Sequence, residues 1–191
     1  ATALALVDPQ TSKKYLFEAT PQQPRQLYML DQQAAHYVLA GVFLTHAHIG
    51  HYAGLMFFGH ESMGASKVPV YAMPRMTQFL SNNGPWSQLV AYNNIALQPL
   101  AHNRTETFAS VGVTPFLVPH RDEFSETVGY SIKGPDKTAL FIPDINKWSV
   151  WKKDIAEVIK TVDYALLDAT FFGAGELPGR DMSKVPHPLV T

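Results

Sequence analysis

Short apolar runs alternate with polar, turn-rich segments along this chain, and the pattern predicts a protein made mostly of strands. Apolar runs at residues 3–7 and 14–17 flank a turn that contains Asp8 and Pro9, so the chain should begin with a β-hairpin. Further strands are predicted at residues 40–45, 68–72, 113–118, 127–132, 138–142 and 164–168. Helices are predicted at residues 25–33, 53–58, 75–81 and 150–161, and residues 82–86 should form a loop.

Strands with helices between some of them indicate an α/β layered protein, in which sheets carry helices on their outer faces. The 191 residues are 46% hydrophobic, which is enough for one globular domain over residues 1–191. The first residue is not Met, and the last residues run toward what looks like another element. We therefore expect the chain to be incomplete at one or both ends, with a further ligand beyond Thr191 left open.

The composition disfavours several classes of partner. Charged residues make up 16% and the formal net charge is -1, so no basic field attracts phosphate backbones, and we expect no nucleic acid partner. No apolar run reaches the roughly 20 residues that span a bilayer, and the N-terminus lacks the basic region of a signal peptide. We expect no membrane partner and a soluble protein, cytoplasmic or periplasmic. Without cysteine, thiolate ligands are excluded.

The strongest chemical signal is a cluster of three histidines directly after the predicted strand 40–45. His46, His48 and His51 form the pattern His-x-His-x-x-His, which chance would place in this chain with a probability of roughly 0.01. Side chains two apart in an extended segment point the same way, so His46 and His48 could bind one ion. Imidazole suits zinc and iron. The alternative is a surface loop that is rich in histidine.

Two later strands also end in residues that can bind metal. His120 follows the apolar run 116–118, and Asp144 follows the apolar run 139–142. Each side chain could project into one shared cleft with the first cluster. The alternatives are a hydrogen-bonded loop histidine at His120 and a turn or helix-capping residue at Asp144.

This order of a strand, His-x-His-x-x-His, a strand-terminal His and a strand-terminal Asp resembles the metallo-β-lactamase superfamily. The resemblance extends from the first hairpin to about Asp168. Residues 118–130 resemble the branch that contains pyrroloquinoline quinone biosynthesis protein B and its hydrolase-like relatives. The resemblance to the superfamily implies an αββα sandwich with metals at the sheet edges. It also implies roles for single residues: a first metal at His46, His48 and His120, a bridging Asp144, and His51 at a second metal.

The chain departs from the superfamily pattern at two positions. Gly50 stands where the pattern His-x-His-x-Asp-His has its aspartate, and glycine has no side chain to bind metal. The family's last histidine has no clear match, because His187 lies between two prolines in what looks like the start of a helix. We therefore expect one tightly bound ion, zinc first with iron or manganese as alternatives, and a weakened second site.

The resemblance implies a metal-dependent hydrolase that uses metal-bound hydroxide on an ester, lactone, amide or phosphoester in a small-molecule substrate. Asp144 is the expected catalytic residue, because it could orient the water. With Gly50 in place of an acid, other candidates for proton transfer are Asp122, Glu123 and His187. Two alternatives stay open: an iron-dependent oxidoreductase in quinone-cofactor biosynthesis, and a non-catalytic member that only binds its ligand. Oligomeric state stays open as well.

Overall fold

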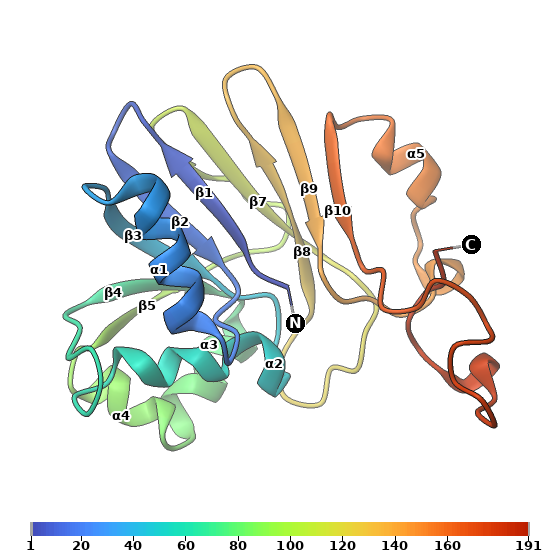
Figure 1. The fold of residues 1–191 in the computed structure, drawn as a ribbon, viewed down its shortest axis with the longest axis horizontal. Helices are drawn as coiled ribbons and strands as arrows, with labels where there is room; N and C mark the ends of the chain where they lie inside the picture. The colour runs from blue at the N-terminus through green and yellow to red at the C-terminus, as the bar shows by residue number, and fades with distance from the viewer. Residues whose placement is uncertain (1, 191) are drawn as a thin grey trace. The chain divides into compact units, whose positions relative to one another are not determined.

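A computed structural model describes residues 2–190 of the chain, which divide into two compact units. The first unit holds the residues up to Ala101 together with Glu123–Glu126, and the second holds His102–Asp122 and the residues from Thr127 onward. Each unit contains one five-stranded sheet, and helices lie beside each sheet (Figure 1). The chain is therefore a mixed α/β protein with two sheets flanked by helices.

The sheet of the first unit has the strand order β1-β2-β3-β4-β5. Its strands are β1 (Leu4–Asp8), β2 (Lys13–Phe17), β3 (Val38–Phe43), β4 (Val68–Ala72) and β5 (Ile95–Pro99). β1 and β2 form an antiparallel hairpin, whereas β2, β3, β4 and β5 pair in parallel. Parallel pairing needs long crossover connections, and helices supply them. They are α1 (Gln23–Ala34), α2 (Ile49–Tyr52), the 3-10 helix η1 (Ala53–Phe58), α3 (Pro74–Asn82) and α4 (Trp86–Ala91).

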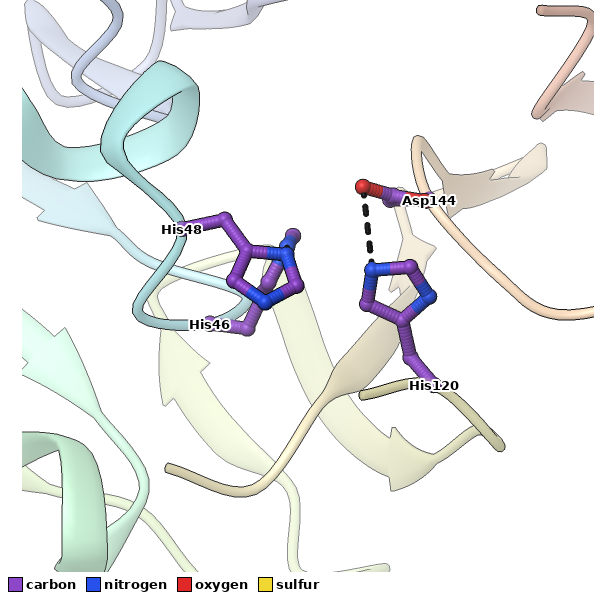
Figure 2. A group of neighbouring side chains, drawn as sticks. All are labelled: His46, His48, His120 and Asp144. Carbon is purple, nitrogen blue, oxygen red and sulfur yellow. Dashed lines mark hydrogen bonds and ion pairs between the residues drawn. The ribbon is translucent and has the colours of Figure 1, made fainter. Parts of the chain in front are cut away.

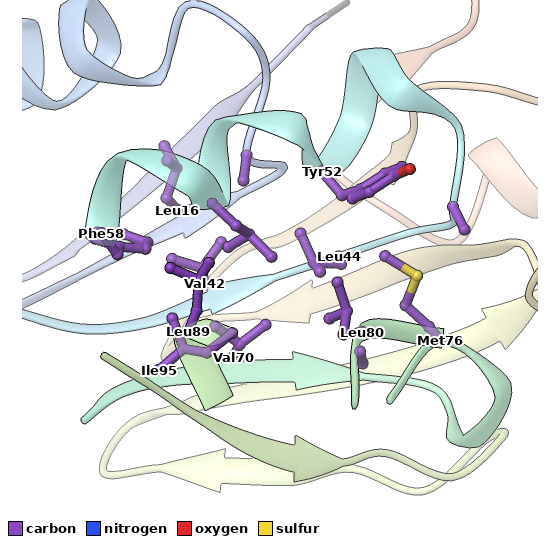
Figure 3. Packing of buried hydrophobic residues seen from close by; sticks show 14 of the residues in the cluster. Leu16, Val42, Leu44, Tyr52, Phe58, Val70, Met76, Leu80, Leu89 and Ile95 are labelled. Carbon is purple, nitrogen blue, oxygen red and sulfur yellow. The ribbon is translucent and has the colours of Figure 1, made fainter. Parts of the chain in front are cut away.

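One face of this sheet packs against its helices and forms the core of the first unit (Figure 3). Val42 and Val70 point from neighbouring strands into a cluster with Leu55 of η1 and Leu80 of α3, and all four side chains are fully buried. The opposite face carries stacked aromatic rings, with Phe43 between Phe17 and Tyr71. A parallel sheet with both faces apolar explains why the strand 38–43 is a continuous hydrophobic run.

The sheet of the second unit has the strand order β10-β9-β8-β7-β6. Its strands are β6 (Glu106–Phe108), β7 (Val111–Leu117), β8 (Val128–Lys133), β9 (Thr138–Ile142) and β10 (Tyr164–Leu167). All neighbours pair antiparallel except β9 and β10, which are parallel and are connected through η2 (Trp148–Val150) and α5 (Ile155–Ile159). Phe116, Leu140 and Ile142 form a core against Trp148 and Ile155.

Most predicted elements are present, and the differences have local causes. The helix predicted at residues 150–161 is present but shorter, at Ile155–Ile159. Trp151 is extended, and the helix starts only after Asp154, whose carboxylate accepts a hydrogen bond from the N–H of Ala156. The predicted loop 82–86 ends where α4 begins, and β5, β6 and α4 were not predicted. Among the described residues, no helix combines the length and apolarity needed to cross a membrane.

Candidate metal centre

The histidine segment of the first unit begins where β3 leaves its sheet. The N–H of Leu44 still donates to the carbonyl of Tyr71 on β4, and after this hydrogen bond the chain departs from the sheet. His46 and His48 lie in the following loop, and His51 lies in the short helix α2. Because β2, β3 and β4 are parallel, their carboxyl ends meet at one edge of the sheet, where such side chains can converge.

The three imidazole rings of this segment lie against one another. His46 Nε2 and His48 Nδ1 are 2.9 Å apart, and the ring of His51 lies 4.2 Å from that of His46, measured between centroids. Two nitrogens bound to one tetrahedral zinc at about 2.0–2.1 Å are separated by roughly 3.3–3.4 Å. His46 and His48 can therefore present two nitrogens to one ion after a small adjustment.

Each ring also has a polar partner beyond this cluster, all in the first unit. Thr45 Oγ1 lies 2.9 Å from His46 Nδ1, and Glu123 Oε2 lies 3.0 Å from His48 Nε2. Glu18 Oε2 lies 2.5 Å from His51 Nδ1. Such outer partners fix the orientation and tautomer of histidines that bind metal.

In the second unit, His120 and Asp144 follow two strands of one sheet and face each other. His120 comes shortly after β7, and Asp144 comes two residues after β9. His120 Nε2 lies 3.3 Å from Asp144 Oδ2, the pair joined by the dashed line in Figure 2, where His46 and His48 are also drawn. Both residues are buried, and His120 Nδ1 lies 3.2 Å from Asn146 Oδ1.

A second group that could hold an ion lies on the other side of Asp144. His187 Nδ1 lies 3.3 Å from Asp144 Oδ1 and 2.8 Å from Asp168 Oδ2. Asp168 follows β10, is buried, and also accepts from the N–H of Ile145. The hydrogen bond that His187 donates to the carboxylate of Asp168 raises the pKa of His187, and the negative charges of Asp144 and Asp168 act in the same direction. Asp144, Asp168 and His187 each offer one possible ligand atom, and these three atoms lie within 4.8 Å of one another.

The sequence prediction was incomplete in this region. No helix starts at His187 within the described residues, so that expectation is wrong; the nearby chain instead forms a bridge between Leu189 and Phe171. Asp122 accepts a hydrogen bond from the hydroxyl of Thr127. Glu18 and Asp168 were not singled out, although each is the first polar residue after an apolar strand, the same signal that pointed to Asp144.

The donor set fits a metal ion of intermediate softness. Imidazole nitrogens with one or more carboxylates suit zinc or iron(II), and the chain has no thiolate to offer. Buried histidines and aspartates that face one another are costly unless they are hydrogen-bonded or bind a cation. The residues present in each unit therefore match the chemistry of a divalent metal site.

A scan against protein-family models matches residues 5–187 to the beta-lactamase superfamily domain. The chain belongs to this family. The match covers both units and all of the histidines and carboxylates described above. A search of curated proteins finds no match for the chain.

Solved structures with this fold include PqqB from Methylobacterium extorquens, crystallised with Zn²⁺. It is 24% identical, with a TM-score of 0.72 over 90% of this chain and 60% of that chain. YhfI from Bacillus subtilis, a metallo-beta-lactamase fold protein, is 12% identical, with a TM-score of 0.64 over 93% and 66%. MEM-A1, a subclass B3 metallo-beta-lactamase from a soil metagenome library, is 15% identical, with a TM-score of 0.57 over 86% and 72%.

These likenesses identify the fold as that of the metallo-β-lactamases, as the resemblance in the sequence implied. The chain spans only about 60% of the length of PqqB and 66% of the length of YhfI. The identities are below 25%, so they do not transfer a substrate or a reaction.

Proposed function

We propose that the chain is a metal-dependent hydrolase whose first metal ion is held by His46, His48 and His120, with Asp144 beside it. The observation that carries this proposal is the pair of nitrogens, His46 Nε2 and His48 Nδ1, facing each other at 2.9 Å in a loop at a sheet edge. Family membership and the zinc in PqqB support a divalent ion at this position.

Chain connectivity supports placing His120 with the other two histidines. His120 belongs to the second unit, but the residues 123–126 that follow closely belong to the first. Three peptide units separate His120 from Glu123, so their Cα atoms are at most about 11 Å apart. Glu123 is hydrogen-bonded to His48. The three peptide units and this hydrogen bond therefore limit how far His120 can lie from His48.

The reaction we propose is hydrolysis of an ester, lactone, amide or phosphoester in a small molecule. When bound, a divalent ion would lower the pKa of its water to about 7 and polarise the bond to be cleaved. Asp144 would orient the attacking water and accept its proton, since it faces His120 on one side and His187 on the other. Asp168 would hold His187 in place for proton transfer to the leaving group.

A second candidate function is redox chemistry with iron. The donor set supports it, because three histidines with one carboxylate would suit Fe(II) as well as zinc. The two proposals differ in the metal that the chain retains. Zinc with hydrolytic turnover supports the first, and iron with consumption of oxygen supports the second.

The test combines metal analysis with activity. Protein purified without added metal is examined by elemental analysis and assayed on a panel of esters, lactones and phosphodiesters, alongside His48→Ala. We expect about one zinc ion per chain, and loss of both metal and hydrolysis in His48→Ala while its circular dichroism is unchanged. His36→Ala removes an exposed histidine outside both clusters and serves as the matched control. Full retention of metal and activity by His48→Ala would exclude the proposed site.

A further inference from the structure

Glu18 is a buried acidic residue that belongs to neither group of proposed metal ligands. It follows β2 directly, and its exposed fraction is 0%. Its backbone φ is +77°, in the left-handed region that side chains other than Asn and Asp rarely adopt. Burial of a carboxylate and an unfavourable φ at the same residue are kept only where the surrounding structure enforces them, and such positions gather at functional sites.

Both carboxylate oxygens of Glu18 bind the histidine segment. Oε1 accepts from the backbone N–H of Thr45 at 2.8 Å, and Oε2 lies 2.5 Å from Nδ1 of His51. The main chain adds two hydrogen bonds, from the N–H of Ala19 to the carbonyl of His51 and from the N–H of Gly54 to the carbonyl of Ala19. One side chain therefore connects the start of the segment to its end.

This arrangement determines which nitrogen of His51 can bind a metal. A carboxylate can only accept a hydrogen bond, so Nδ1 of His51 must carry the proton that lies between it and Glu18. In the neutral ring the lone pair is then on Nε2. Since the His51 ring packs against that of His46, its Nε2 is the nitrogen that can act in the same cluster.

We infer that Glu18 is a positioning residue that fixes His51 as an Nε2 ligand for a second metal ion, an inference that rests on the proposed metal-dependent function. Glu18 does not replace the acid missing at Gly50, because both of its oxygens are engaged by Thr45 and His51. It acts through His51. With Gly50 in place of the aspartate, His51 is the ligand for the second ion that this segment keeps, and Glu18 orients it.

Glu18→Gln tests this role because an amide has one acceptor and one donor. The N–H of Thr45 is fixed in the backbone and can only donate, whereas His51 can exchange its tautomer. The amide oxygen should therefore face Thr45 and the amide NH₂ should face His51, which forces the ring proton to Nε2. We expect nitrogen-detected NMR of the metal-free protein at mildly alkaline pH to show His51 with Nδ1–H in the unmodified chain and Nε2–H in the variant.

Zinc titration by calorimetry then measures the consequence for binding. We expect the affinity for the second Zn²⁺ to fall about 10–100-fold in Glu18→Gln, as for other changes to residues that orient metal ligands, with the first ion affected less than threefold. Asp8→Asn is the matched control, since Asp8 is also buried and accepts from a backbone N–H and from the hydroxyl of Thr11.

The two readouts separate failure of this inference from failure of the proposed function. An Nε2–H tautomer of His51 in the unmodified protein overturns the role of Glu18, whatever reaction the chain catalyses. Equal losses of the second ion in Glu18→Gln and Asp8→Asn overturn it too, because they would reflect general destabilisation. If the tautomers are as expected but hydrolysis is absent, the positioning role stands and the hydrolase proposal fails.

Discussion

At the scale of single residues, one signal accounts for most of the candidate site: the first polar side chain after an apolar strand. It singles out His120 and Asp144 in the sequence, and it applies equally to Glu18 and Asp168, whereas His46 comes one residue later, after Thr45. The sequence alone could not tell that Glu18 contacts His51, because the two are 33 residues apart and meet only through the parallel pairing of β2 with β3.

Replacing Gly50 with Asp should create a stronger second metal site. The position lies in α2, directly before His51, so a carboxylate there would supply the ligand that the superfamily pattern has and this chain lacks. We expect calorimetric titration to show one tight Zn²⁺ in the unmodified chain and two in Gly50→Asp. Gly50→Ala, which adds a side chain without a ligand, should behave like the unmodified chain. Two equally tight sites in the unmodified chain would contradict this prediction.

Asp144→Asn should lower zinc affinity by at least about 10–100-fold, the loss found for outer-shell changes. The amide keeps the shape of the carboxylate but removes the charge that lies between His120 and His187. Competition with a fluorescent zinc chelator measures the change. Asp163→Asn removes a carboxylate that binds Lys137 outside both clusters, and it should leave the affinity unaltered. If Asp144→Asn behaves like this control, Asp144 has only a turn-forming role.

At the scale of elements, long and uniformly apolar strands could be predicted and short or mixed ones could not. β4 and β9 have the predicted bounds, because a lysine directly precedes each strand and a proline follows within two residues. β6 has three residues and β5 ends in Gln98-Pro99, so neither carries a clear alternating or continuous apolar pattern. Helix α5 begins later than predicted because the carboxylate of Asp154 caps it.

Gly54 lies in η1, and a methyl group at this position should strongly disrupt the packing of that helix. A Cβ there would lie 2.1 Å from the carbonyl oxygen of Thr20 and 2.9 Å from that of Ala19, and backbone atoms cannot move aside as a flexible side chain can. We expect Gly54→Ala to lower the free energy of unfolding by about 1–3 kcal/mol or more, measured by urea denaturation. Gly175→Ala, which meets no atom within 4 Å, should change it by less than about 0.5 kcal/mol. Equal stabilities would refute the close approach.

At the scale of the whole molecule, the sequence predicted an α/β protein of the metallo-β-lactamase type, and the fold confirms it. The boundary between the two units was not visible in the sequence. Residues 123–126 join the first unit through Ser125, whose hydroxyl accepts from the N–H of Ala47, and through Glu123 at His48. Hydrogen bonds between residues 75 or more positions apart leave no mark in local hydrophobic patterning.

Metal removal should lower the stability of the chain if the proposed site exists. An ion that binds only the folded state at a free concentration 100 times its Kd adds about 2.7 kcal/mol to the free energy of unfolding. Differential scanning calorimetry should therefore show a lower melting temperature after treatment with a chelator, and restoration by Zn²⁺. His48→Ala should show the same melting temperature with and without chelator. A chelator effect of equal size in that variant would place the stabilising ion elsewhere.

Residues 123–126 belong to the first unit although the residues on both sides of them belong to the second, and this affects how the chain responds to proteolysis. The backbone passes from one unit to the other three times, after Ala101, after Asp122 and after Glu126. Cleavage by a protease after Ala101 would leave no covalent bond between residues 1–101 and the rest of the chain, but the other fragment would still carry Ser125 and Glu123, which hydrogen-bond to Ala47 and His48. A single nick at residue 101 would therefore yield two bands in a denaturing gel, and under native conditions only non-covalent contacts such as these two would join residues 1–101 to residues 123–126.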